Sequence, residues 1–69
     1  MDLAKLVEAS RGRRKWSPED VEYESRRSIS ARTVRNIEGG ADCMLSTVRT
    51  LASLFGWTDA ELGRMVRHG

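Results

Sequence analysis

Apolar residues recur along this 69-residue chain at spacings of three and four, which are typical of amphipathic helices. No stretch alternates between apolar and polar residues over the length of a strand, and the chain contains one proline. The spacing predicts five helices with short connections, over residues 2–11, from 18 to between 24 and 27, 31–38, 46–55 and from 59 onward. We therefore expect one compact all-α domain spanning residues 1–69.

Capping residues and glycines mark most of these helix boundaries. Ser17 followed by Pro18 is the clearest start, because serine can accept an unpaired backbone amide and proline suits the first helical position. The other expected N-caps are Ser30, Ser46 and Thr58, the last in a capping box with Glu61. The expected stops are glycines: Gly12, Gly39 with Gly40, and Gly56.

Positions that share a helix face are the expected core. They are Leu3, Leu6, Val7 and Ser10 in the first helix, Val34 and Ile37 in the third, Val48, Leu51, Ala52 and Phe55 in the fourth, and Leu62, Met65 and Val66 in the fifth. Trp16 is expected to anchor the same core. The second helix is weakly amphipathic, because Val21 is its only aliphatic residue, and Tyr23 is one of the few candidates to face inward.

The third predicted helix has one apolar side and one side that suits DNA. Arg32 and Asn36 are four residues apart and fall opposite the apolar positions, with Ala31 and Arg35 beside them. In the major groove, arginine pairs with guanine, asparagine pairs with adenine, and a small apolar side chain can touch the thymine methyl. Arg35 could reach a base or a phosphate. The same pattern also fits a solvated helix face.

Basic residues are concentrated in one part of the chain, although the net charge is only +2. Residues 11–35 contain eight cations and four acids, and these acids all lie between two basic blocks. A localised basic face indicates an anionic partner better than a high overall charge does. The alternative is a solubilising surface, because arginine and lysine are common on small domains.

The remaining residue types argue against several other functions. The single cysteine, Cys43, cannot form an internal disulfide, and no cluster of zinc ligands surrounds His68. The acids Glu19, Asp20, Glu22 and Glu24 fit a helix start and a solvated surface better than a catalytic pair. We therefore expect no enzymatic activity, no cofactor, no metal and no small-molecule substrate. The sequence shows neither a leader nor an apolar run that could span a membrane, which predicts a cytoplasmic location without membrane contact.

The order of these parts resembles the helix-turn-helix domain of the lambda-repressor and Cro-like family. The resemblance covers about residues 3–62 and is strongest over 29–40, Ile-Ser-Ala-Arg-Thr-Val-Arg-Asn-Ile-Glu-Gly-Gly, which is similar to the family's recognition helix and its Ile-Glu-x-Gly ending. Residues 16–21, Trp-Ser-Pro-Glu-Asp-Val, resemble the opening of the first motif helix. Leu51-Ala52, Gly56 and Leu62 resemble the closing helices.

This resemblance implies a sequence-specific transcriptional regulator that binds double-stranded DNA through a helix-turn-helix at about residues 17–38. Helix 30–38 would lie in the major groove, and the operator is expected to be palindromic. The expected role is that of a small Cro-like phage or prophage repressor. The alternatives are an antitoxin-type regulator and a protein–protein interaction module that reuses the same fold.

The pattern and the resemblance together assign the residues of the expected site. The base-reading residues are Ala31, Arg32, Arg35 and Asn36, and the phosphate-binding residues are Arg13, Arg14, Lys15, Ser17, Arg26, Arg27 and Ser30. The backbone amides at the start of the second helix are expected to be free to hold a phosphate. The family pattern pairs Glu38 with Arg11 as a scaffold contact. Any homodimer would use residues 62–66, the Met44-Leu45 loop or Trp57, which also suit the core.

Two features depart from the family pattern. The span from Ser17 to Ser30 is longer than usual, and Glu22 and Ser28 stand at or near the places of a small alanine and a turn glycine. The loop at residues 41–45 is acidic to apolar, where relatives often carry basic phosphate contacts. We therefore expect an altered angle of the third helix and phosphate contacts from the two basic blocks.

Overall fold

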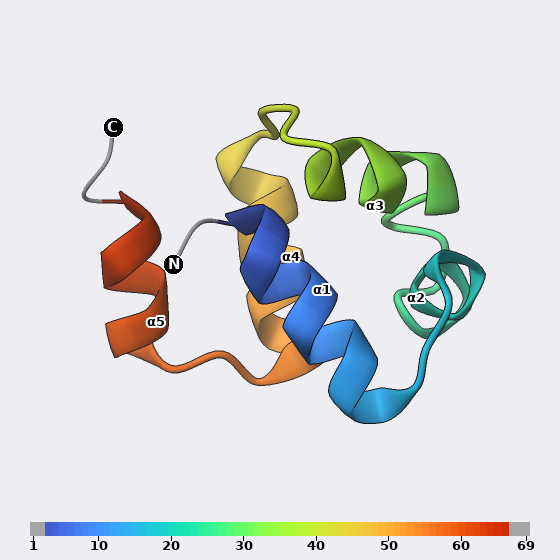
Figure 1. The fold of residues 1–69 in the computed structure, drawn as a ribbon, viewed down its shortest axis with the longest axis horizontal. Helices are drawn as coiled ribbons and strands as arrows, with labels where there is room; N and C mark the ends of the chain where they lie inside the picture. Colours follow the sequence, from blue (N-terminus) through green and yellow to red (C-terminus); the bar gives the residue numbers. More distant parts are fainter. Residues whose placement is uncertain (1–2, 67–69) are drawn as a thin grey trace.

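Five α-helices follow one another along the chain in the computed structural model, which describes residues 3–66 and the side chains up to residue 62 (Figure 1). They are α1 (Leu3–Arg14), α2 (Pro18–Glu24), α3 (Ala31–Glu38), α4 (Leu45–Phe55) and α5 (Asp59–Val66). The described residues contain no strand, so the predicted all-α, five-helix architecture is confirmed. Asp2, the expected first residue of the first helix, lies outside the described residues. Within the described part, no helix is long and apolar enough to cross a bilayer.

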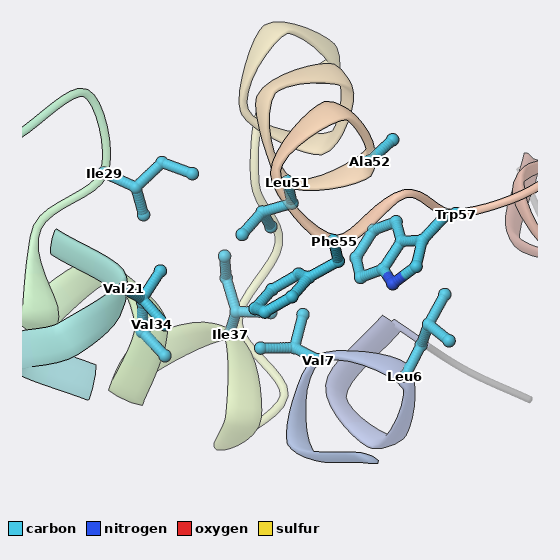
Figure 2. Packing of buried hydrophobic residues seen from close by; sticks show 10 residues of the cluster. All are labelled: Leu6, Val7, Val21, Ile29, Val34, Ile37, Leu51, Ala52, Phe55 and Trp57. Carbon is cyan, nitrogen blue, oxygen red and sulfur yellow. The ribbon is translucent and has the colours of Figure 1, made fainter. Parts of the chain in front are cut away.

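One apolar cluster holds the first four helices together (Figure 2). Its members are Leu6, Val7, Val21, Ile29, Val34, Ile37, Leu51, Ala52, Phe55 and Trp57. Val7, Val21, Val34 and Leu51 have no exposed surface, and each comes from a different one of the helices α1 to α4. Burying such a side chain stabilises the fold by about 1.5–3 kcal/mol relative to leaving it in water. Each of these four helices is therefore tied to the others through its own side chain in the cluster.

Tryptophans join α1 and the chain after α4 to this cluster. Trp57 is buried, and its Nε1 donates a hydrogen bond to the buried Oγ of Ser10 at 2.7 Å. Trp16 is half-buried and packs on Phe55, with ring centroids 5.8 Å apart, which agrees with its expected anchoring role. Trp57 is therefore a core residue and is not available to a dimer partner.

Some expected core positions lie elsewhere. Tyr23 is 78% exposed, so the expectation that it faces inward is wrong, and Ile29 supplies the buried side chain beyond the end of α2 instead. Val48 is only half-buried. Leu62 packs partly buried against the cluster, whereas the side chains of Met65 and Val66 lie outside the described residues.

Helices α1 to α4 all end in the same backbone arrangement. The left-handed residues are Lys15, Arg26, Gly40 and Gly56, with φ of 57°, 56°, 100° and 70°. The amide of each following residue donates back across the last turn, at 3.0 Å from Trp16 to Arg11, 2.8 Å from Arg27 to Glu22, 2.9 Å from Ala41 to Asn36 and 3.0 Å from Trp57 to Ala52. These bonds are those of Schellman and related left-handed caps, which satisfy carbonyls that a helix end leaves unpaired.

Two helix boundaries differ from the prediction, because the residues that end α1 and begin α4 are not the glycine and the serine or threonine that usually do so. Gly12 stays inside α1, and the helix runs to Arg14 because Lys15 takes the left-handed position that glycine normally occupies. Helix α4 starts one residue earlier than predicted: Met44 is its N-cap without a side-chain hydrogen bond, so the expected Ser46 cap is wrong. The predicted Thr58–Glu61 capping box is confirmed, with Glu61 N–H donating to Thr58 Oγ1 at 3.2 Å and Thr58 N–H to Glu61 Oε1 at 3.1 Å.

Glycine at position 15 is expected to stabilise the fold. A side chain in the left-handed region costs about 1 kcal/mol or more, and Lys15→Gly removes that strain, so the free energy of unfolding in urea should rise by about 1 kcal/mol. The matched control is Ala9→Gly at an exposed position inside the same helix, which should lower it by about 1 kcal/mol. Equal losses for both variants would contradict a strained end of α1.

Candidate nucleic-acid interface

Helix α3 packs against both α1 and α2 and divides into a buried and an exposed side. Val34 and Ile37 are buried, whereas Arg32, Arg35 and Asn36 are exposed. The predicted division is thus confirmed for these residues. Ala31 is an exception, because only 6% of it is exposed. The expectation that its methyl group stands on the exposed face is therefore wrong: Ala31 lies three residues before the buried Val34 and so shares its side of the helix.

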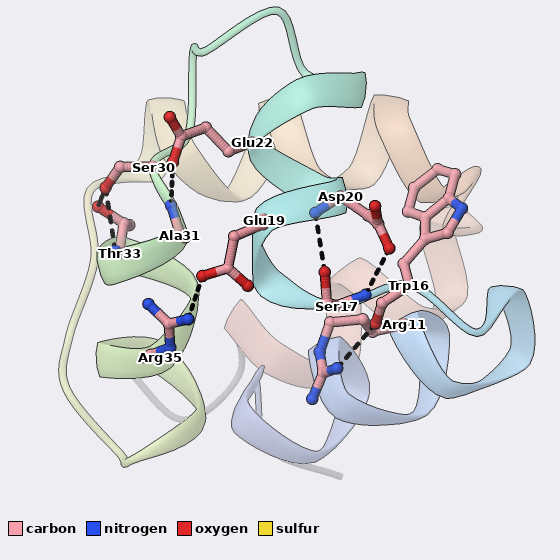
Figure 3. A network of polar contacts seen from close by, with 10 residues as sticks. All are labelled: Arg11, Trp16, Ser17, Glu19, Asp20, Glu22, Ser30, Ala31, Thr33 and Arg35. Carbon is pink, nitrogen blue, oxygen red and sulfur yellow. Dashed lines mark hydrogen bonds and ion pairs between the residues drawn. The ribbon is translucent and has the colours of Figure 1, made fainter.

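Two side chains cap the start of α3 (Figure 3). The Oγ of Ser30 accepts a hydrogen bond from the Thr33 amide at 3.1 Å, as its predicted N-cap role requires, and also bonds the Thr33 hydroxyl at 2.9 Å. The amide of Ala31 donates to the carboxylate of Glu22 at 2.8 Å. Glu22 therefore ties α2 to the beginning of α3. Sequence reasoning missed this contact, because no local pattern links residues nine positions apart.

An ion pair holds the other end of α3. The guanidinium of Arg11 donates from Nε to Glu38 Oε2 at 2.8 Å and from Nη2 to Oε1 at 2.9 Å, and from Nη1 to the Trp16 carbonyl at 2.8 Å. This is the pair that the resemblance implied. The two side chains are 23% and 17% exposed, and the hydrogen bond to Glu38 raises the pKa of Arg11 above its ordinary value. Helix α3 is thus fixed at both of its ends.

Arg35 is not free on the exposed side of α3. Its Nη2 donates to the carboxylate of Glu19, which lies in the first turn of α2, and the two side chains meet between these helices (Figure 3). The side chains are 57% and 60% exposed. The hydrogen bond from Arg35 lowers the pKa of Glu19, so the carboxylate stays ionised at neutral pH.

The long connection between α2 and α3 is an ordered turn. Arg26 and Arg27 both adopt left-handed conformations, with φ of 56° and 65°, and both side chains are exposed. The hydroxyl of Ser25 donates to the Glu22 carbonyl at 3.0 Å, and its oxygen accepts from the Ile29 amide at 3.2 Å. The extra residues therefore place two arginines on the surface between the helices.

The basic block before α2 is exposed, but one of its residues also makes contacts within the fold. Arg13, Arg14 and Lys15 are all exposed. Arg14 in addition lays its guanidinium over the rings of Trp16 and Phe55, at 5.4 and 5.2 Å from their centroids. Its Nη2 donates to the Phe55 carbonyl at the end of α4 at 3.0 Å. Arg14, expected at a phosphate, therefore also joins the end of α1 to the end of α4.

The start of α2 is occupied by its own capping box. Ser17 Oγ accepts from the Asp20 amide at 3.2 Å, and the Ser17 amide donates to the Asp20 carboxylate at 2.8 Å. The predicted capping role of Ser17 is confirmed. The expectation that the amides there are free is wrong for these two, and the Asp20 carboxylate adds a negative charge where a phosphate would bind.

Other reactive groups are few in the described part of the chain. No group of three or more His, Cys, Asp and Glu residues lies together there in a way that could hold a metal ion. Cys43 is a free, half-buried thiol whose pKa is raised by burial and by the nearby Asp42, so it is protonated at neutral pH. His68 lies outside the described residues.

Comparison with known proteins identifies no family for this chain. It matches no family model, no curated protein and no solved structure. What the exposed side of α3 can bind therefore has to be inferred from the geometry of α2 and α3 and from the residues that hold these helices.

Removing the carboxylate of Glu22 is expected to loosen the start of α3. Glu22→Ala leaves the Ala31 amide without its acceptor, and the loss of such a cap costs about 0.5–2 kcal/mol, measured as the free energy of unfolding in urea. Glu24→Ala is the matched control, because it removes an exposed acid of the same helix. If both substitutions changed stability equally, the contact between Glu22 and α3 would have no specific role.

Proposed function

We propose that this protein is a sequence-specific double-stranded DNA-binding regulator, with α2 and α3 forming a lambda-repressor-like helix-turn-helix. The observation that carries the proposal is the exposed side of α3. Arg32, Arg35 and Asn36 stand on one surface, while the opposite side of the helix is buried and both its ends are tied down. Arginine and asparagine have the donor geometry that distinguishes guanine and adenine in the major groove.

Exposed cations at both ends of α2 supply the contacts to the DNA backbone in this proposal. Arg13 and Lys15 precede the helix, and Arg26 and Arg27 follow it. A helix of seven residues is roughly 10 Å long, which is comparable to the major groove width of about 12 Å. Cations beyond the two ends of a helix of this length suit phosphates that flank the groove into which α3 would insert.

A protein–protein interaction module with this fold is the main alternative, and burial of Arg32 would favour it. Arg32 is exposed, which supports DNA binding instead. A Cro-like repressor or an antitoxin-type regulator would each bind a palindromic operator as a homodimer. Met44 and Leu45, which are 72% and 57% exposed, are the described apolar residues best placed to take part in pairing.

Selection of bound sites from a random duplex library tests the proposal directly. A regulator of this kind should enrich one short sequence, and a palindromic consensus would also give the geometry of the dimer. Retention on random DNA should fall steeply as salt is raised, because bound cations displace counterions from the phosphates. A protein that enriches no sequence and shows no salt-dependent retention is not a DNA reader.

Removing a base-reading side chain should weaken binding at one base pair. Arg32→Ala and Asn36→Ala are each expected to cost about 1–3 kcal/mol of binding free energy on the selected site and to relax the preference at a single position. Arg49→Ala is the control, because it removes an exposed arginine from α4 without touching α3. Fluorescence anisotropy with labelled duplexes measures both effects, and an equal loss in the control would contradict base reading by α3.

Substituting the two neighbouring arginines at the end of α1 should affect different properties, DNA affinity in one case and stability in the other. Arg13→Ala should weaken binding to all sequences alike and reduce the slope of log affinity against log salt by about 1. Arg14→Ala should mainly lower the free energy of unfolding, by about 1 kcal/mol, because it removes the hydrogen bond to the Phe55 carbonyl and the contact with two rings. The reverse result would show that Arg14 is the phosphate contact.

A further inference from the structure

The Glu19–Arg35 pair occupies the surface that the proposed function turns toward DNA. Arg35 lies on the exposed side of α3 with Arg32 and Asn36, and Glu19 reaches it from the first turn of α2. More than half of each side chain is exposed, so the pair is open to a ligand approaching that surface. The contact uses a single nitrogen of Arg35, Nη2.

Stability does not account for this pair. An ion pair with this much exposure contributes little to folding, because water already solvates both charges. The helices that carry it are held by the buried Val21 and Val34. Asp20 already supplies the acid that favours the positive end of α2. The fold therefore has no evident need for a carboxylate at position 19.

The carboxylate changes what Arg35 can bind. An arginine whose charge is balanced by a carboxylate is a poor partner for a phosphate, because the phosphate is repelled by the same carboxylate. The N–H groups of Arg35 that do not bond Glu19 can still donate hydrogen bonds to a ligand. Guanine offers two acceptors in the major groove, O6 and N7, and the paired cytosine offers the donor N4. An arginine beside a carboxylate thus presents groups complementary to both bases of one G·C pair.

We propose that Glu19 determines specificity by directing Arg35 onto guanine and accepting a hydrogen bond from N4 of the paired cytosine. The inference rests on the proposed function, since it requires that α3 enter the major groove. It assigns Arg35 to a base, a choice that the sequence left open. It also gives Glu19 a role in excluding other base pairs, because a carboxylate facing the acceptor O4 of thymine is unfavourable.

Site selection with matched charge variants tests the inference. Glu19→Gln and Glu24→Gln each remove one negative charge from α2, but only Glu19 contacts Arg35. We expect the wild type and Glu24→Gln to select the same site with one strongly preferred G·C pair. Glu19→Gln should lose about tenfold or more of the preference at that pair and keep the rest of the site. Arg35→Ala should lose the preference at the same pair, and the double variant should show no further loss.

The outcomes separate this inference from the proposed function. If the wild type and Glu19→Gln select the same site, the role of Glu19 is overturned, while the proposal of sequence-specific DNA binding stands. A wild type that selects no site would remove both. The melting temperature of Glu19→Gln, followed by circular dichroism, should stay close to that of the wild type. A marked fall would make the pair a structural contact and would also overturn the inference.

Discussion

Helix α3 has eight residues, and an isolated helix of that length does not persist in water, so its exposed side depends on the burial of its other side. Val34 and Ile37 enter the common core, and hydrogen bonds from outside the helix hold each end. These few interactions therefore fix the position of every candidate DNA contact on α3. Destabilising the core would therefore be expected to disturb recognition before any exposed residue is changed.

The residues that end α1 and α2 are basic, so the turns after these helices also carry positive charge. The caps at the ends of α3 and α4 use glycine in the left-handed position, whereas those at α1 and α2 use Lys15 and Arg26. Glycine would be the less strained choice. The basic residues place a cation at each end of α2, which is where the proposed function requires contacts to phosphates. Each of these two positions thus combines a strained backbone conformation with a charged side chain.

Arginines that are close in sequence differ in the contacts that they make within the fold. Arg11 pairs with Glu38, and Arg14 lies over two aromatic rings and bonds the end of α4. Arg13, between them, is exposed like Arg14 but makes no such contact with the described residues. The helical period accounts for this, since residues three apart share a face and the residue between them points elsewhere. A basic block in the sequence is therefore a poor guide to the number of cations available to DNA.

Local signals in the sequence determined the number of helices, most of their boundaries and the polar and apolar sides of α3, because capping and periodicity act between residues within one or two turns. The pair between Arg11 and Glu38 followed from the resemblance. Tertiary structure alone decided the contacts of Glu22 and Glu19 with α3, the placement of Arg14 and the burial of Ala31. Each of these depends on how helices lie against one another, and the distance between residues far apart in the chain is set by packing of the core rather than by local pattern.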